Sequence, residues 1–161
     1  MTHVIHEIPP VYDDRSKILI LGSFPSVKSR EGQFFYHHKQ NRFWKVLAAV
    51  FEDTLPETIE EKKEFLLRHN IAIWDVIASC DIEGSSDSSI KNAVPNDFSF
   101  LLKTAPIRQI YTNGGTAYKL YHKYCEKVTG FEAVKLPSTS PANASYSLER
   151  LISQWNQISN T

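Results

Sequence analysis

The feature that most constrains this chain is the alternation of short apolar runs with amphipathic stripes. Four runs rich in branched and aromatic residues, at 18–21, 71–77, 107–112 and 131–136, are typical of strands. The first two are apolar at consecutive positions, which favours strands buried on both faces. Strands that alternate with helices favour right-handed crossovers and a parallel sheet covered by helices. We therefore predict an α/β fold.

The segments between these runs have helical spacing. Apolar residues at offsets of three and four predict helices over 43–51, over 117–128 and from about 145 to 158. A shorter helix is expected around 98–102, with Asn96 as its N-cap.

One further segment lies between the first and second predicted strands, and another lies between the second and third. Another helix is expected to open near Thr54, whose T-x-x-E spacing to Glu57 is typical of a capping box. The polar stretch 81–92, rich in serine, is predicted to be a surface loop.

The length of 161 residues predicts one domain over 1–161, with residues 1–14 as an N-terminal extension. A hydrophobic content of 42% suffices for one core without disulfides or metal. The 18 basic and 18 acidic residues balance, which excludes a disordered polyelectrolyte and a protein that binds nucleic acid through bulk charge alone. Any DNA contact must come from a local patch.

The two cysteines, Cys80 and Cys125, do not form a CxxC pair, which argues against a zinc ribbon, a redox motif or a disulfide scaffold. A reducing cytoplasm fits this cysteine usage best. Pro9, Pro10 and charged residues interrupt the N-terminal segment, so no signal peptide is expected, and no stretch approaches a membrane span. We expect a cytoplasmic protein with no membrane partner.

In an open α/β sheet, ligands bind outside the carboxyl ends of the strands. The segments that follow the four predicted strands are 22–36, 75–79, 113–115 and 137–143. We expect these four loops to converge on one face and to form the binding site.

The first of these loops holds four aromatic residues: Phe24, Phe34, Phe35 and Tyr36. Phe34 and Phe35 are expected to fill the core beneath the loop. One of the other rings is a candidate to stack on a nucleobase. The adjacent His37 and His38 lack other ligands at suitable spacing, so we expect no metal.

Polar groups follow at the start of the next helix and after the last strand. Asn41, flanked by Arg42, opens the helix with Phe43, and taken alone it fits a simple N-cap. The late loop LPSTSPANAS offers hydroxyls and amides suited to phosphate, although such loops are also common turns.

Three motifs in order carry a family resemblance: GSFPS from Gly22, the string Y-x-H-x-x-NRFW from Tyr36, and LPSTSPANA from Leu136. Together they resemble the uracil-DNA glycosylase superfamily, particularly its hypoxanthine-DNA glycosylase branch and the mismatch-specific uracil/thymine glycosylases. The resemblance runs from about Lys17 to the last helix. The ordered combination is specific, whereas each motif alone is not.

The resemblance implies a three-layer α/β/α sandwich around a short four-stranded parallel sheet. It implies a base excision repair enzyme that flips a deaminated base out of double-stranded DNA and hydrolyses its N-glycosidic bond, leaving an abasic site. Hypoxanthine is the first expected base and uracil the second. No cofactor is implied, and we expect a monomer.

The resemblance also implies roles for individual residues. Asn41 is the expected catalytic carboxamide, and Asp75 is a candidate carboxylate supplement or a turn cap. Relatives with GINPG carry a catalytic asparagine in the first motif, where this chain offers serines instead. The expected base-binding residues are Gly22, Ser23, Phe24, Pro25, Tyr36 and Asn113. The expected DNA contacts are Arg42, Lys45, Ser138, Thr139, Ser140 and Asn143.

The chemistry suits an asparagine, because cleavage passes through an oxocarbenium-like sugar and needs a water placed against C1′. A carboxamide orients that water but is a poor proton acceptor, so a slow enzyme is expected. Lys28, Lys39 and Lys45 have polar neighbours that do not lower an amine pKa, which argues against a Schiff-base lyase. The competing hypotheses are a non-catalytic module that binds a nucleotide or damaged DNA, and a hydrolase of free nucleosides.

Overall fold

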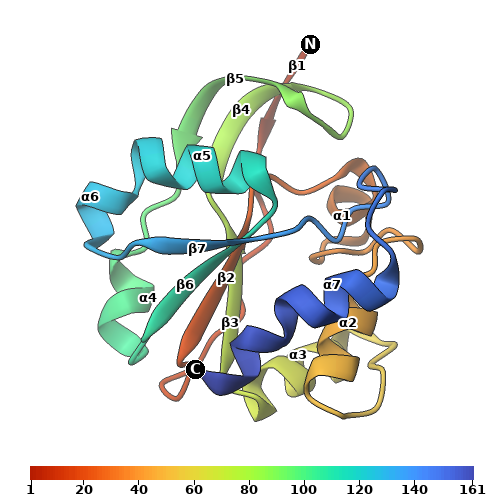
Figure 1. Cartoon of the computed structure of the whole chain (residues 1–161). Coiled ribbons are helices and arrows are strands. Elements are labelled where there is room, and N and C mark those ends of the chain that lie inside the picture. Colours follow the sequence, from red (N-terminus) through yellow and green to blue (C-terminus); the bar gives the residue numbers. More distant parts are fainter.

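The centre of the protein is a four-stranded parallel sheet in the order β3-β2-β6-β7. The computed structural model describes all 161 residues. The strands are β2 (Ile18–Gly22), β3 (Ile71–Asp75), β6 (Gln109–Asn113) and β7 (Ala133–Leu136). In register, Gly22 at the end of β2 lies opposite Asp75 at the end of β3. The predicted parallel α/β sheet is confirmed (Figure 1).

Helices cover both faces of this sheet and create two cores. Ile18 and Ile20 of β2 belong to one core, whereas Leu19 and Leu21 belong to the other, because successive side chains of a strand point to opposite faces. Helices α2 (Phe43–Val50), α3 (Ile59–Arg68) and α7 (Leu148–Trp155) supply the first core, and α4 (Ser99–Thr104) and α5 (Gly115–Tyr124) supply the second. Figure 1 shows the resulting three layers, as the resemblance implied.

Several predicted helix ends are corrected by the structure. The capping box lies at Thr58 and Glu61, not at Thr54 and Glu57, because the helix begins only at Ile59. The predicted helix over 117–128 breaks at Cys125 into α5 and the short α6 (Glu126–Thr129). The last helix ends at Trp155 and continues as a 3₁₀ turn, η1 (Asn156–Asn160).

Asn96, the predicted N-cap of α4, caps nothing there. The N-cap position belongs to Phe98, which makes no side-chain cap hydrogen bond. Asn96 Nδ2 instead donates to the backbone oxygen of Asp75 at 2.9 Å. This asparagine therefore fixes the end of β3, next to the predicted site.

The prediction of a surface loop over 81–92 is wrong, because this segment forms most of a β-hairpin. Strands β4 (Ile77–Glu83) and β5 (Ser86–Pro95) pair with each other, and β1 (Thr2–Ile5) pairs with β4, giving a second, antiparallel sheet. Ile77, Cys80 and Ile82 of β4 are buried in the second core. Serine and charged residues on the solvent side make the segment resemble a loop. Register shifts along the β4–β5 pair also interrupt the alternation of apolar and polar residues that predicts a strand.

The tip of this hairpin lies against the loop after β2 and against α1 (Val27–Gly32). Val27 N donates to Ser85 Oγ at 2.9 Å, and Arg30 Nη2 donates to the backbone oxygen of Gly84 at 2.6 Å. The hairpin is thereby attached to the first motif. None of the helices combines the length and apolar character needed to cross a membrane.

Candidate active site

A cavity of about 130 Å³ opens at the carboxyl ends of the parallel strands. All four predicted loops contribute to it, through residues 22–26, Asp75, Asn113 and residues 138–140. Asn41 also lines the cavity. The prediction that these loops converge is confirmed, because parallel strands end at the same edge of the sheet.

Asn41 is half-buried on the cavity wall, and its amide orientation is fixed by hydrogen bonds. Its Oδ1 accepts from Phe43 N at 2.9 Å and from Thr139 Oγ1 at 2.8 Å. Thr139 Oγ1 in turn accepts from Asn113 Nδ2 at 3.0 Å, and Thr139 N donates to Asn113 Oδ1 at 3.0 Å. Asn41 Nδ2 donates to no protein group and is not among the buried unpartnered polar atoms. The free group of this carboxamide is therefore a hydrogen-bond donor.

Asn41 also helps to cap α2, as its simpler interpretation predicted, although it lies one residue before the N-cap position. The N-cap position of α2 is Arg42, and Asn41 Oδ1 reaches the amide of the first helical residue, Phe43. The same contact that starts the helix thus orients the amide toward the cavity.

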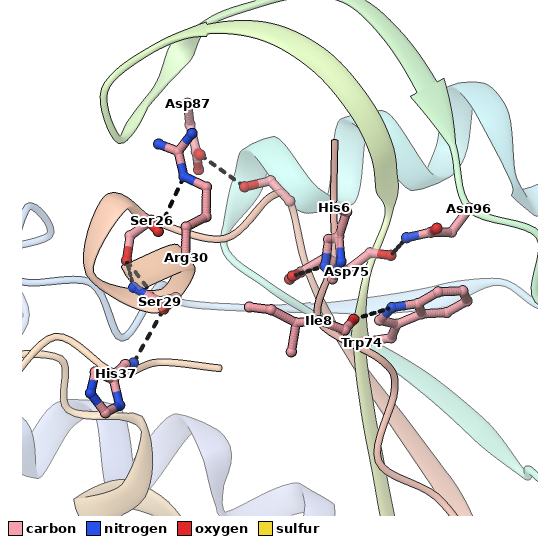
Figure 2. Close-up of polar contacts among 11 residues, drawn as sticks. His6, Ile8, Ser26, Ser29, Arg30, His37, Trp74, Asp75, Asp87 and Asn96 are labelled. Carbon is pink, nitrogen blue, oxygen red and sulfur yellow. Dashed lines mark hydrogen bonds and ion pairs between the residues drawn. The ribbon is translucent and has the colours of Figure 1, made fainter. Parts of the chain in front are cut away.

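Asp75 lies at the end of β3 with 3% of its surface exposed. His6 Nε2 donates to Asp75 Oδ2 at 2.8 Å (Figure 2). Asp75 Oδ1 accepts no protein hydrogen bond and faces the Gly22 Cα, where a Cβ would lie 2.5 Å from it. Glycine at position 22 is thus required for the carboxylate to reach the cavity.

The predicted base-stacking residue, Tyr36, lines the cavity. One face of its ring is stacked on Phe43, with centroids 4.0 Å apart, and its hydroxyl is buried without a partner. Burial and the nearby Asp75 carboxylate raise the pKa of the Tyr36 phenol, so the group is neutral at physiological pH. Phe24 also lines the cavity, whereas the first core contains Phe34, as predicted.

Phe35, the other ring expected to fill the core, is also buried in the first core, with 2% of its surface exposed. It nevertheless reaches the cavity wall.

Two cavity residues at the hairpin tip, Ser85 and Asp87, were not predicted from the sequence. Asp87, near the start of β5, accepts from Ser23 Oγ at 2.9 Å and lines the cavity. Desolvation and the nearby Asp75 carboxylate raise the pKa of Asp87, although the Ser23 hydrogen bond opposes the shift. A carboxylate inside a serine-rich hairpin tip has no distinguishing sequence pattern, because its position depends on how the hairpin folds back.

The late loop forms one side of a wider groove that adjoins the cavity and includes Ser138, Ser140 and Asn143. It is held by its own side chains: Ser138 Oγ accepts from Ser140 N at 3.1 Å, and Asn143 Nδ2 donates to the backbone oxygen of Ser138 at 3.0 Å. The predicted DNA-contacting loop is thus an ordered wall.

Arg42, predicted to contact DNA, directs its guanidinium into this loop. Its Nη2 donates to the backbone oxygens of Ser140 at 3.1 Å and Asn143 at 3.0 Å, and its Nη1 donates to that of Tyr146. Lys45, the other predicted basic contact, is exposed on α2 and does not line the cavity. Arg42 therefore shapes the groove from within the protein.

No group of three or more His, Cys, Asp or Glu side chains is placed to hold a metal ion. Cys80 and Cys125 are free, buried thiols, and burial raises the pKa of Cys125 to about 11. The chemistry available in the cavity is that of two carboxylates, two oriented carboxamides and several hydroxyls.

A family model described as the uracil DNA glycosylase superfamily matches residues 9–158. The chain belongs to the uracil DNA glycosylase superfamily. Two curated relatives are named hypoxanthine DNA glycosylase. The one from Methanosarcina acetivorans is 38% identical over 152 residues, covering 93% of this chain and 94% of the relative. The one from Methanosarcina barkeri is 35% identical over 136 residues, covering 84% of this chain and 85% of the relative.

A solved structure in this superfamily is also similar. It is a solution NMR structure from M. acetivorans described as a candidate uracil DNA glycosylase, with a TM-score of 0.83 and 34% identity, covering 98% of this chain and 97% of that one. The fold of this glycosylase-superfamily member is therefore shared across nearly the whole chain.

Proposed function

We propose that this protein is a monofunctional DNA glycosylase that removes hypoxanthine, and secondarily uracil, from double-stranded DNA. The observation that carries the proposal is the Asn41 amide, which Phe43 N and Thr139 Oγ1 fix in place and whose donor is free in the cavity that the buried Asp75 carboxylate also lines. The names of the two curated relatives support hypoxanthine as the base.

The floor of the cavity matches a deaminated base. Asp75 Oδ1 is an acceptor with no protein partner, and it is held in place because His6 occupies Oδ2. Hypoxanthine and uracil each carry a ring N–H beside a carbonyl, whereas adenine presents a lone pair at that ring nitrogen. A carboxylate accepts from the ring N–H but repels the lone pair, and sites built around such groups discriminate strongly. Asp75 thereby favours the lesion over the parent base.

Asn41 assists hydrolysis as a donor. Its free Nδ2 holds the attacking water through the water oxygen, because Oδ1 is occupied by two donors. A group fixed in advance by hydrogen bonds needs no reorganisation when charge develops at the sugar. The three-residue network of Asn41, Thr139 and Asn113 thus serves to position water.

The remaining walls fit a DNA strand. Ser138, Ser140 and Asn143 present hydroxyls and amides along the groove outside the cavity. The formal net charge of zero implies few phosphate contacts and a modest, salt-sensitive affinity. No lysine lines the cavity, which supports hydrolysis without a Schiff-base lyase step. We expect the enzyme to act as a monomer in the cytoplasm.

The test is a panel of duplexes that contain hypoxanthine, uracil, xanthine or a thymine mispair, each treated with alkali after incubation to break the strand at abasic sites. The expected result is strand breakage with hypoxanthine, less with uracil, and none without alkali. Free deoxyinosine, incubated in parallel, is expected to stay intact. Binding of every duplex without base release would contradict the proposal and identify a binding module.

A further inference from the structure

The attacking water must lose a proton, and Asn41 cannot accept it. Its Oδ1 already accepts from Phe43 N and Thr139 Oγ1, which leaves only the Nδ2 donor. The open acceptors with charge in this cavity are the carboxylates of Asp75 and Asp87. Of the protein groups that line the cavity, these two carboxylates are the ones able to receive the proton.

The two carboxylates lie at different depths. Asp75 is 3% exposed at the end of β3, on the floor of the cavity. Asp87 is solvent-exposed on the hairpin and lines both the cavity and the adjoining groove that holds Ser138. A flipped nucleotide enters base first, so its base contacts the floor and its sugar stays at the rim, next to the phosphates. Asp87 is therefore the carboxylate at the level of C1′.

Hydrogen bonds also fix the position of the Asp87 carboxylate and of the hairpin tip that carries it. Ser23 Oγ donates to Asp87 Oδ1 at 2.9 Å, whereas Asp87 Oδ2 makes no protein hydrogen bond. Two further contacts, from Val27 N to Ser85 Oγ and from Arg30 to the backbone oxygen of Gly84, fix the hairpin tip on either side of the first motif. The first motif thus orients an acidic group from another part of the chain.

We propose that Asp87 is a second catalytic residue, which takes the proton of the attacking water, and that Ser23 is its positioning residue. This inference rests on the proposed glycosylase function. The water oxygen forms the bond to C1′, and the electron pair of the C1′–N bond leaves with the base. The water proton passes to Asp87 Oδ2 and then to solvent, while the departing base takes a proton from solvent. The anionic carboxylate also stabilises the cationic sugar before the proton moves.

The charges around Asp87 suit a base. Asp75, which pairs with His6, lines the same cavity and lies close enough for its charge to act on Asp87. The other titratable groups nearby are Arg30 of α1, the Cys80 thiol of β4 and the Tyr36 phenol on the cavity wall. Although the residue as a whole is exposed on the hairpin, desolvation of its carboxyl group in the cavity and the nearby Asp75 raise the pKa of Asp87 above its ordinary value. A base works only when deprotonated, so the rate should fall as the pH drops through this raised pKa and stay level above it.

The experiment measures single-turnover cleavage of a hypoxanthine duplex across pH for wild type, Asp87→Asn and Ser23→Ala. Asp81→Asn is the matched control, since Asp81 lies on the same hairpin, bonds to His3 and Asn92, and does not line the cavity. Asp87→Asn should lower the rate by about 10²–10⁴-fold and abolish the acid limb. Affinity for a duplex with 2′-fluorinated deoxyinosine, which resists cleavage, should change by less than about threefold, within the usual error of a binding measurement.

Ser23→Ala keeps the carboxylate but removes its donor, so it tests the inference even if Asp87→Asn fails to fold. Because that hydrogen bond lowers the pKa of Asp87, its loss should move the acid limb to higher pH and slow cleavage about tenfold. A folded Asp87→Asn that cleaves at the wild-type rate, or an unchanged pH profile in Ser23→Ala, would overturn the inference and leave the glycosylase function standing. A wild-type protein inactive on every lesion would overturn both.

Discussion

His6 Nε2 donates to Asp75 Oδ2 at 2.8 Å, with 2% of the His6 side chain and 5% of the Asp75 side chain exposed. The histidine comes from the segment that follows β1 and is surrounded by the rings of Phe24, Phe35 and Trp74. The N-terminal residues, expected to be an extension, therefore supply the partner of a buried carboxylate in the site. A buried charge without its partner is costly.

Replacing His6 with Ala should lower the free energy of unfolding by about 3 kcal/mol, because Asp75 then loses the donor that compensates its burial. His6→Gln retains a side-chain donor and should recover part of this loss. Urea denaturation of the three proteins measures the difference. A His6→Ala protein as stable as the wild type would show that Asp75 finds another partner or is protonated.

Asn41→Ala should abolish abasic-site formation, because the water loses its donor, while the protein remains folded. The two bonds that Oδ1 accepts are replaced by solvent at a half-buried position, so the stability cost should be about 1–2 kcal/mol. Alkali cleavage of a hypoxanthine duplex and a denaturation curve are the two measurements. Undiminished turnover by this variant would remove Asn41 from the mechanism.

Thr139→Val is a separate test of how the Asn41 amide is oriented. The substitution removes the hydroxyl that donates to Asn41 Oδ1 while keeping a similar volume. We expect slower cleavage by about tenfold, since the loss of one oriented bond is worth about 1 kcal/mol or slightly more. Single-turnover kinetics with unchanged duplex affinity would support this role, and a wild-type rate would contradict it.

Gly22→Ala should disrupt the site, because the added Cβ would lie 2.5 Å from Asp75 Oδ1 and 3.0 Å from the Tyr36 hydroxyl. The side chains must move apart, at a cost of about 1–3 kcal/mol and with loss of cleavage. Gly115→Ala is the matched control, since nothing lies within 4 Å of its added Cβ, at the start of α5. That variant should be as stable as the wild type or slightly more so. Equal behaviour of the two variants in thermal melts would contradict the steric argument.

Arg42→Lys should loosen the late loop, because an ammonium cannot reproduce the guanidinium fork that spans three backbone oxygens. Amide hydrogen exchange over residues 138–146 should accelerate, and duplex affinity should fall with it. Lys45→Ala, at an exposed position on the same helix, should leave exchange in that loop unchanged. If both variants weaken binding without faster exchange, Arg42 acts on DNA directly.

The parallel sheet could be predicted because β2 and β3 are unbroken, buried apolar runs and because all four strands alternate with helical patterns. The convergence of Gly22, Asp75 and Asn113 followed from one rule, that parallel strands end at a common edge, whereas Asn41 was expected in the site only from the family resemblance. These residues lie at element ends, where the fold leaves little freedom. Sequence reasoning therefore located most of the cavity.

The β4–β5 hairpin could not be predicted, because its strands carry serine and charge on the solvent side and break their alternation at bulges. Because the hairpin was not predicted, Asp87 was not predicted as a site residue either. It reaches the cavity only through contacts with Ser23 and its neighbours. His6 was missed for a similar reason, since nothing in the local sequence indicates that it lies near Asp75, 69 residues away. Long-range pairs of single polar side chains have no periodicity to detect.

The hydrogen bond between Asn41 and Thr139 joins residues 98 positions apart in the chain. A nascent polypeptide that has not yet emerged from the ribosome beyond this threonine therefore has no oriented amide, however much of the sheet has already formed. Under the proposed mechanism, base removal therefore requires synthesis and folding of the chain at least as far as Thr139.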